Sequence, residues 1–437
     1  MEWLVTCKLE AIELKLSKLL IALGASLPLI SLVPLAAVAQ QTQPAPAPPP
    51  VLAPMGLPLY QSQISCPNLQ RQLQLAVGQE APVWSISVVD QNGRLLADLN
   101  GEIPRIPASN QKLISTAIAI DRLGPDHRLS TQLWQLPDGT LRLQGSGDPT
   151  MGFPQLRRLA KLASGAGGSS GVATGTVRLQ LEEEPRSRWW PQGWPYADRD
   201  YSYGAPITRL ALTANAVDMA VSDPPARLER LISQEISRNG RQVAISSVPA
   251  GTPEPEGSLL LLSEPSSSMH HLMSLANADS HNFTAEVLLR EGTGSWSLPV
   301  ADQRAMDWLR QQGLPMQGVS VVDGSGLDRN NRVTTRFFTA LLLRMYQHPY
   351  AQNYFGSMAV AGQRGTLGGY FRGTSLEGRF SGKTGTISGV KAISGRLQTP
   401  DGPLFVSMIS NGSSAPVPVM GQVLKAAQRL SSCQQPL

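Results

Sequence analysis

Three short motifs, arranged in one order along a chain of 437 residues, place the strongest constraint on how this protein can fold. They are S-N-Q-K (109–112), S-H-N (280–282) and K-T-G (383–385). Each motif is weak evidence alone, because short patterns recur by chance. Together they describe a site where a serine is acylated and a lysine acts as its base. Such a site forms only if the fold brings three distant segments into one pocket.

The first motif contains a candidate nucleophile, Ser109, and a candidate base, Lys112. A serine hydroxyl attacks well only when a base removes its proton. A helix is predicted over 109–123, closed by Gly124, and residues three apart on a helix face the same side. Apolar neighbours would desolvate Lys112 and lower its pKa toward neutrality, so that it accepts the Ser109 proton. The alternative is that Ser109 merely caps the helix and Lys112 is solvated.

The second motif contributes Ser280 and Asn282, in a predicted loop between two helices. There Ser280 can relay a proton between Lys112 and a leaving group, and Asn282 can hold Lys112 together with a substrate amide. The alternative is helix capping, because serine and asparagine are favoured at helix N-termini.

The third motif is predicted on a β-strand. Lys383 and Thr384 would bind a substrate carboxylate, the lysine by charge and the threonine by a hydrogen bond. Gly385 would let a substrate backbone come close, and the amide of Thr386 is a candidate donor to an oxyanion. The alternative is an exposed basic edge strand.

The first 39 residues are typical of an export signal. Lysines precede an apolar run that ends in A-V-A (37–39), which suits cleavage before Gln40. An uncleaved membrane anchor is the alternative, because about twenty apolar residues can span a bilayer. A linker rich in proline and alanine (40–60) follows the signal.

Two cysteines, Cys66 and Cys433, remain after such a cleavage and lie near opposite ends of the chain. Exported proteins commonly pair their cysteines, so a disulfide between the two is expected. Two free thiols are the alternative.

The character of the chain changes between residues 127 and 262. Short β-like segments fill this part, whereas helical periodicity and longer strands occupy 61–126 and 263–437. We therefore expect an α/β (α+β) domain formed by the two outer segments, interrupted by a β-rich insert.

The composition and charge exclude several functions. Hydrophobic residues make up 41% of the chain and charged residues 16%, as in a globular protein. The formal net charge of +5 would favour contact with an anionic wall polymer or a membrane surface, although it is also ordinary for a soluble domain. We expect no nucleic-acid partner, since no basic cluster is present. The five histidines show no metal-ligand spacing, so we expect neither a metal nor a cofactor.

The chain resembles the class C low-molecular-mass penicillin-binding proteins, which are the D-alanyl-D-alanine carboxypeptidase/endopeptidase family. The resemblance covers about residues 65–430 and includes P-A-S-N-Q-K-L (107–113), S-H-N-F-T-A-E-V-L-L-R (280–290), D-G-S-G-L-D-R-N-N-R (323–332) and G-K-T-G-T (382–386). It implies a penicillin-binding transpeptidase/β-lactamase-like fold with extra domains inserted between the first and second motifs.

The resemblance also implies a function. Family members are exported, periplasmic enzymes that act on peptidoglycan stem peptides and are blocked by penicillins. Ser109 would be acylated by the penultimate D-Ala with Lys112 as general base, and water would then release the acyl group. Ser280 and Asn282 would complete the proton network, while Lys383 and Thr384 would bind the terminal carboxylate.

Two other functions remain as alternatives. One is a serine β-lactamase or esterase on the same fold, which is disfavoured because no E-x-x-L-N-like segment lies between the last two motifs. The other is a non-catalytic scaffold that binds the cell wall, which the intact Ser109, Lys112 and Lys383 disfavour. The preference between carboxypeptidase and endopeptidase action stays open.

Overall fold

A computed structural model describes residues 63–165, 175–429 and 433 of the chain. The predicted signal segment (1–39) and linker (40–60) lie outside these residues. Within the described part, no helix combines the length and the apolar character needed to cross a membrane.

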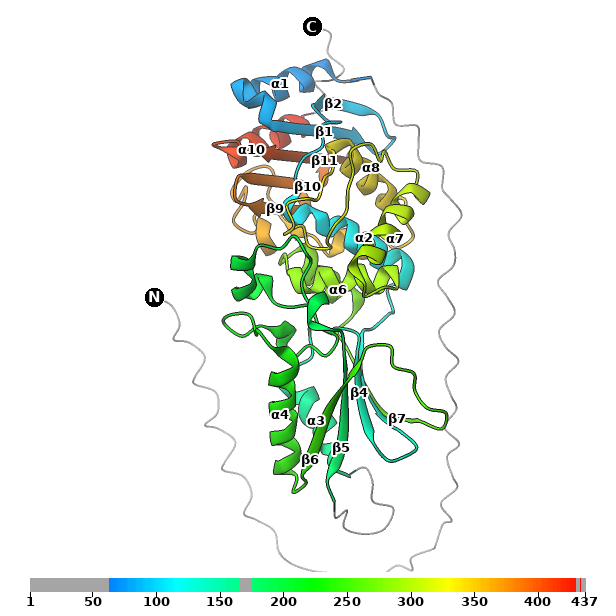
Figure 1. The fold of residues 1–437 in the computed structure, drawn as a ribbon. Helices are drawn as coiled ribbons and strands as arrows, with labels where there is room; N and C mark the ends of the chain where they lie inside the picture. Colours follow the sequence, from blue (N-terminus) through cyan, green and yellow to red (C-terminus); the bar gives the residue numbers. More distant parts are fainter. Residues whose placement is uncertain (1–62, 166–174, 430–432, 434–437) are drawn as a thin grey trace, which may run out of the picture. The chain divides into compact units, whose positions relative to one another are not determined.

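The larger of the two described sheets is antiparallel, with six strands in the order β2-β1-β11-β10-β9-β8 (Figure 1). Its strands are β1 (Trp84–Asp90), β2 (Leu95–Leu99), β8 (Ala359–Val360), β9 (Phe380–Ile387), β10 (Val390–Thr399) and β11 (Gly402–Asn411). β1 and β11, from opposite ends of the chain, pair in the middle of the sheet. Asn92-Gly93 lies in the tight turn that joins β1 to β2, and Gly93 has the positive φ that such a turn requires.

Helices cover both faces of this sheet, so its central strands are buried on both sides. On β11, Phe405 packs into a core with α8 (Thr335–Tyr346). The next residue, Val406, packs into a second core with α1 (Pro67–Val77) and α10 (Pro416–Ala427). Because side chains alternate along a strand, one strand contributes to two cores.

A group of helices packs into the same core as α8, and one of them begins at Lys112 of the first motif. These helices are α2 (Lys112–Leu123), α5 (Met269–Asn277), α6 (Asn282–Thr293), α7 (Leu298–Gln311) and α9 (Ala351–Gly356). α2 is central, since each of its residues from Lys112 to Ile120 is buried. The helix predicted over 109–123 is confirmed only from Lys112 onward, because Ser109 lies on a preceding 3₁₀ turn, η2 (Ala108–Gln111).

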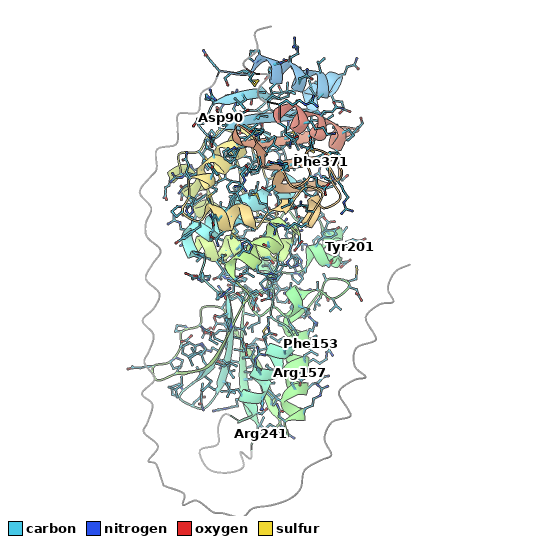
Figure 2. All side chains as sticks on the ribbon, turned by 180° about the vertical axis from the view of Figure 1, so that it is seen from behind. Asp90, Phe153, Arg157, Tyr201, Arg241 and Phe371 are labelled. Atoms are coloured by element: carbon cyan, nitrogen blue, oxygen red, sulfur yellow. A yellow bond between two sulfur atoms is a disulfide. The ribbon has the colours of Figure 1, made fainter. Side chains whose placement is uncertain are left out.

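A second sheet, in the order β6-β5-β4-β3-β7, lies between the first and second motifs in the sequence. Its strands are β3 (Ser130–Gln135), β4 (Leu141–Gly145), β5 (Val177–Glu183), β6 (Val243–Pro249) and β7 (Leu259–Pro265). The helices α3 (Phe153–Gly165) and α4 (Pro224–Arg238) belong to the same core. Phe153 and Arg157 of α3 are labelled in Figure 2.

The expected β-rich insert is confirmed by this five-stranded sheet, and α3 and α4 are two helices of the insert that the sequence analysis did not predict. α4 buries Leu228, Ile232 and Ile236, which are spaced four residues apart as on one helix face. This four-residue period is visible in the sequence, but the short β-like segments on either side of it led us to predict only strands in this part of the chain. The insert boundaries at 127 and 262 stay a prediction.

A disulfide joins Cys66, which precedes α1, to Cys433. The two residues are 367 positions apart in the sequence. Cys66 is fully buried in the core formed with α1 and α10. The bond therefore fixes both ends of the described chain on one face of the six-stranded sheet.

Candidate active site

The first motif brings Ser109 and Lys112 into direct contact. Ser109 lies on η2 and Lys112 is the first residue of α2. Lys112 Nζ is 2.9 Å from Ser109 Oγ, which is a hydrogen-bond distance. Proton transfer between these two groups therefore needs no rearrangement of the side chains.

Lys112 is fully buried and is held by three acceptors. Besides contacting Ser109, its Nζ donates to Asn282 Oδ1 at 2.6 Å and to the carbonyl oxygen of Ser325 at 2.7 Å. Burial lowers the pKa of Lys112 to about 7, against the opposing effect of the Asp323 and Glu286 carboxylates. A lysine with this pKa is partly neutral at pH 7 and can accept a proton.

The loop between α7 and α8 holds the Ser325 carbonyl against Lys112. Glu286, a fully buried residue of α6, accepts hydrogen bonds from the amides of Gly324 and Ser325 at 2.9 and 2.8 Å. Its second carboxylate oxygen pairs with Arg290 at 2.8 Å. α6 therefore supports Lys112 twice, directly through its first residue and indirectly through Glu286.

Asp323 anchors the same loop from within. Its carboxylate accepts hydrogen bonds from the amides of Gly326 and Asp328 at 2.7 and 2.8 Å, and from the Trp194 indole at 2.9 Å. The loop is thus tied to the segment that follows β5. Although acidic side chains gather here, no group of three or more His, Cys, Asp or Glu residues in the described part of the chain is placed to hold a metal ion.

The second motif lies at the start of α6. Ser280 has a φ of +64°, and Asn282 is the first residue of the helix. While Asn282 Oδ1 contacts Lys112, its Nδ2 donates to the carbonyl oxygen of Tyr203 at 2.8 Å. Among the described residues, no hydrogen bond joins the Ser280 hydroxyl to Lys112 or Ser109. The relay role of Ser280 stays a prediction.

The third motif lies on β9, and its placement on a strand is confirmed. Lys383 is fully buried, which contradicts the alternative of an exposed basic strand, and its Nζ donates to the Thr384 carbonyl at 2.8 Å. Burial and the nearby charge of Lys112 lower the pKa of Lys383 well below its usual range. Thr384 Oγ1 bonds to Thr366 Oγ1 at 2.8 Å, and Thr386 is exposed.

Two glycines let the backbone of the first motif pack closely against its neighbours. A Cβ on Gly385 would lie 2.6 Å from the carbonyl oxygen of Pro107, and one on Gly326 would lie 1.9 Å from that of Ala108. Gly326 also has a φ of +82°, which disfavours other residues. The close approach of a substrate backbone to Gly385 stays a prediction, and in the structure the Cβ position of this glycine faces the backbone that leads into Ser109.

Three groups that fix the site lie outside the predicted set: the Glu286 carboxylate and the carbonyls of Ser325 and Tyr203. Glu286 follows Asn282 by four residues, so the two share a face of α6. A lone carboxylate in the apolar run A-E-V-L-L (285–289) is the signal that could have revealed it. Backbone carbonyls leave no comparable signal, because every residue has one.

Comparison with known proteins identifies the family. The model described as the D-Ala-D-Ala carboxypeptidase 3 (S13) family matches residues 69–226 and 215–429. The D-alanyl-D-alanine carboxypeptidase of Actinomadura sp. (strain R39) is 28% identical, over 78% of this chain and 80% of its own length. The carboxypeptidase DacB of Mycolicibacterium smegmatis is 25% identical, over 89% of this chain and 90% of its own.

Solved structures support the fold. Penicillin-binding protein 4 (dacB) of Haemophilus influenzae, which has also been solved in complex with a β-lactam, matches with a TM-score of 0.69 at 17% identity, over 83% of this chain and 99% of its own. A predatory peptidoglycan endopeptidase of Bdellovibrio bacteriovorus matches with a TM-score of 0.52 at 18% identity, over 81% of this chain and 93% of its own. The predicted penicillin-binding fold is confirmed. Because the family model also extends over most of the sequence, this chain belongs to the D-Ala-D-Ala carboxypeptidase 3 (S13) family.

Proposed function

We propose that the protein is a serine-type D-Ala-D-Ala carboxypeptidase or endopeptidase that cleaves peptidoglycan stem peptides through an acyl-enzyme on Ser109. The observation that supports this best is the 2.9 Å contact between Ser109 Oγ and the fully buried Lys112. A base is most effective when its pKa lies near the working pH, and the pKa of Lys112 is about 7. The family and its D-alanyl-D-alanine carboxypeptidases supply the substrate class.

Acylation begins when neutral Lys112 takes the proton of the Ser109 hydroxyl and Oγ attacks the carbonyl carbon of the penultimate D-Ala. The tetrahedral intermediate collapses as the C–N bond breaks, and the proton passes to the departing amine. Ser280, two residues before Asn282, would relay this proton. Water then attacks the ester, which frees the shortened peptide and restores the Ser109 hydroxyl.

Lys383 and Thr384 are the groups proposed to bind the terminal carboxylate of the substrate. Desolvation and the charge of Lys112 both disfavour a charged Lys383. An entering carboxylate would offset these two effects, because an opposite charge nearby favours the ammonium form. Substrate binding and protonation of Lys383 would therefore be coupled.

Inhibition by β-lactams and export to the periplasm complete the proposal. A penicillin resembles the D-Ala-D-Ala end of the stem peptide and would acylate Ser109, and a related penicillin-binding protein 4 has been solved with a β-lactam bound. The export signal predicted in residues 1–39 would deliver the enzyme to the compartment that holds peptidoglycan.

Release of D-alanine from an acylated tripeptide ending in D-Ala-D-Ala tests the proposed function. The wild-type protein should release D-alanine, and Ser109→Ala should release none while keeping the same melting temperature. Ser237→Ala is the matched control, because Ser237 is exposed and belongs to a second S-x-N pattern on α4. Undiminished release by Ser109→Ala would reject the acyl-enzyme.

A further inference from the structure

A hydrogen bond from the first motif reaches the strand beside Lys383. Asn110 directly follows Ser109 on η2, and its Nδ2 donates to Ser394 Oγ of β10 at 2.7 Å. Both side chains are fully buried. The Asn110 Oδ1 has no hydrogen-bond partner among the described residues, so the bond to Ser394 is the one that fixes this amide there.

Ser394 lies directly opposite Lys383 in the six-stranded sheet. β9 and β10 are antiparallel neighbours, and their register pairs these two residues. Directly opposed residues on neighbouring strands project from the same face of a sheet. On its other side Ser394 pairs with Ser407 of β11, and the two Oγ atoms bond at 2.8 Å. Because Asn110 donates to Ser394, the Ser394 hydroxyl keeps its own proton for Ser407. Ser394 is therefore held by the strands on both sides.

A second contact between η2 and this face lies one step along the same strands. The next pair of residues on the face is Gly385 and Ala392. A Cβ on Gly385 would lie 3.2 Å from the Cβ atoms of Ala108 and Ala392, so Ala108 packs over this pair. Apolar contact of this kind does not fix a position along a strand, whereas a hydrogen bond is directional. The bond from Asn110 to Ser394 is therefore the contact that can set the register of η2 along β9 and β10.

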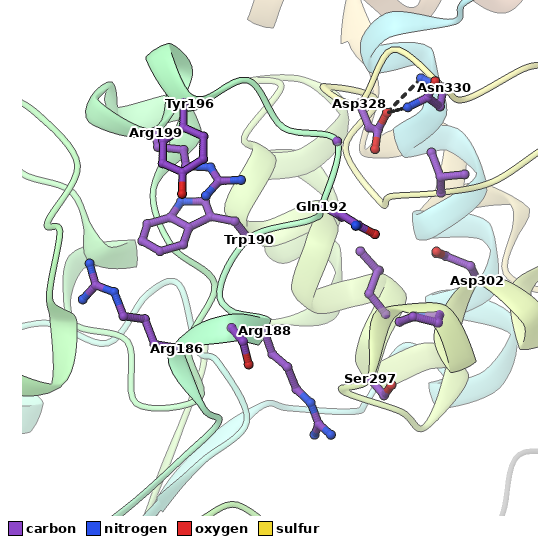
Figure 3. A pocket seen from close by; sticks show the side chains of 15 residues that line it. Arg186, Arg188, Trp190, Gln192, Tyr196, Arg199, Ser297, Asp302, Asp328 and Asn330 are labelled. Atoms are coloured by element: carbon purple, nitrogen blue, oxygen red, sulfur yellow. Dashed lines mark hydrogen bonds between the residues drawn. The ribbon is translucent and has the colours of Figure 1, made fainter.

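Ser394 has no exposed surface on which a ligand could rest. It is also absent from the residues that line the hollow in Figure 3, whose walls include Asp302 and Asp328. Any effect of Ser394 on a substrate must therefore pass through the groups that it holds, which are the Asn110 amide and the strand that carries Lys383.

We propose that Asn110 is a positioning residue, which sets the separation between Ser109 and Lys383 through its bond to β10. Ser109 adjoins Asn110 in the chain, and Lys383 is paired with Ser394 in the sheet. Their bond thus joins the nucleophile to the group that would bind a terminal carboxylate. A fixed separation favours substrates whose carboxylate lies one residue beyond the bond that is cleaved. The roles of Ser109 and Lys383 rest on the proposed function, whereas the contact between Asn110 and Ser394 does not.

The preference for a terminal carboxylate tests this role. Two acylated tripeptides ending in D-Ala-D-Ala serve as substrates, one with a free carboxylate and one with a C-terminal amide. The ratio of their kcat/KM values is the carboxylate preference. In the Ser394→Ala protein this preference should fall about tenfold, because a substrate anchored on Lys383 would no longer be aligned with Ser109. Cleavage of the amide should change little, since the 2.9 Å contact between Ser109 and Lys112 lies within the first motif.

Ser87→Ala is the matched control. Ser87 is also fully buried, and it lies in the same row of the sheet, paired with Ser407. Within the described part of the chain its hydroxyl bonds to Thr335 and Asp98 and not to η2. This variant should lose stability to a similar extent and keep the wild-type preference. An undiminished preference in the Ser394→Ala protein, or an equal fall in both variants, would overturn the proposal.

Asn110→Ala tests the other end of the same bond, and it decides the question if the Ser394→Ala protein does not fold. It should lower the carboxylate preference by the same factor. The double variant should lose no more than either single variant, because each substitution removes the same interaction. Losses that multiply in the double variant would show that the two side chains act separately and would overturn the proposal.

Hydrogen exchange separates this inference from the proposed function. Wild-type protein that cleaves neither peptide would reject the proposed function. The inference can then still be decided, because loss of the bond to Ser394 should speed amide exchange in the peptide that contains η2 about tenfold. Ser87→Ala should leave the exchange of this peptide unchanged. Equal exchange of η2 in the wild-type and Ser394→Ala proteins would overturn the inference whatever the activity.

Discussion

Lys112 is completely buried, and its surroundings act on the charge of its amine in two opposite ways. Desolvation favours the neutral amine, while the buried carboxylates of Glu286 and Asp323 favour the ammonium form. The balance sets the pKa of Lys112 at about 7, where a modest change in either contribution alters the neutral fraction of this proposed base. The same three hydrogen bonds that fix Nζ also orient it toward Ser109.

The pH dependence of acylation follows from this pKa. In the proposed mechanism neutral Lys112 is the base, so the rate of Ser109 acylation should rise with pH up to about 7 and level off above it. Lys112→Met keeps most of the side-chain volume and removes the base, so acylation should slow by about 100- to 10,000-fold. Rapid-mixing measurements with a fluorescent penicillin report both quantities. A fully active Lys112→Met protein would mean that another group is the base.

Glu286→Gln tests the electrostatic support of the base. The amide oxygen can still accept the bonds from Gly324 and Ser325, but the negative charge is lost. The pKa of Lys112 should therefore fall, and the acid limb of the pH profile should move down by on the order of one pH unit.

The control for this variant lies on the same helix. Glu291 is a second carboxylate of α6, and it bonds to Trp296 instead of the loop. Glu291→Gln should leave the acid limb where it is. If the acid limb of the pH profile does not move in the Glu286→Gln protein, the Glu286 carboxylate stabilises the fold but does not set the pKa of Lys112.

Among the elements, η2 determines where Ser109 lies, and two glycines determine where η2 lies. β9 contacts η2 through Gly385, and the loop before α8 contacts it through Gly326. Ala108, between these two contacts, has a φ of +48°. Tight packing therefore holds the backbone just before Ser109, the proposed nucleophile, in a conformation that an isolated chain would rarely adopt.

Gly385→Ala should displace η2, because the added Cβ would lie 2.6 Å from the Pro107 carbonyl oxygen. We expect the free energy of unfolding to fall by about 1–3 kcal/mol, as in other overpacked sites. The acylation rate should fall about 100-fold, since small displacements of a nucleophile are costly. Gly369→Ala is the control, because nothing lies near its Cβ position, and it should change neither quantity. Gly385→Ala protein with wild-type kinetics would contradict the packing role.

Elements with a clear local pattern could be predicted from the sequence, and others could not. β1 alternates and is followed by Asn92-Gly93, and α2 is apolar and ends at Gly124. α8 was missed because almost all of its residues are buried, so no polar face marks its period. The contact of Lys112 with Asn282 was predicted, but its contact with the Ser325 carbonyl was not. Such contacts depend on how elements that are distant in the sequence pack together.

At the scale of the whole molecule, the six-stranded sheet joins segments from near both ends of the described chain. β1 pairs with β11, α1 and α10 share one core, and the disulfide joins Cys66 to Cys433. The sequence predicted that these cysteines could pair, but it left free thiols as an alternative. The pairing of the chain ends in one sheet explains why two residues so far apart come together.

Loss of this disulfide should lower stability and leave the chemistry intact. A cross-link between distant residues restricts the unfolded chain, and its removal typically costs about 2–5 kcal/mol. Cys433→Ser should therefore lower the melting temperature, and reductant should do the same to the wild-type protein. The acylation rate at 25 °C should not change, because Cys66 packs in a core separate from that of Lys112 and α2. An unchanged melting temperature after reduction would contradict this role.

Mass spectrometry after incubation with penicillin G tests most directly whether Ser109 is the nucleophile. We predict one adduct per chain, located by peptide mapping on Ser109 and absent from the Ser109→Ala protein. An adduct on any other residue, or no adduct on folded wild-type protein, would contradict the proposal that Ser109, Lys112 and Lys383 form one acylating site.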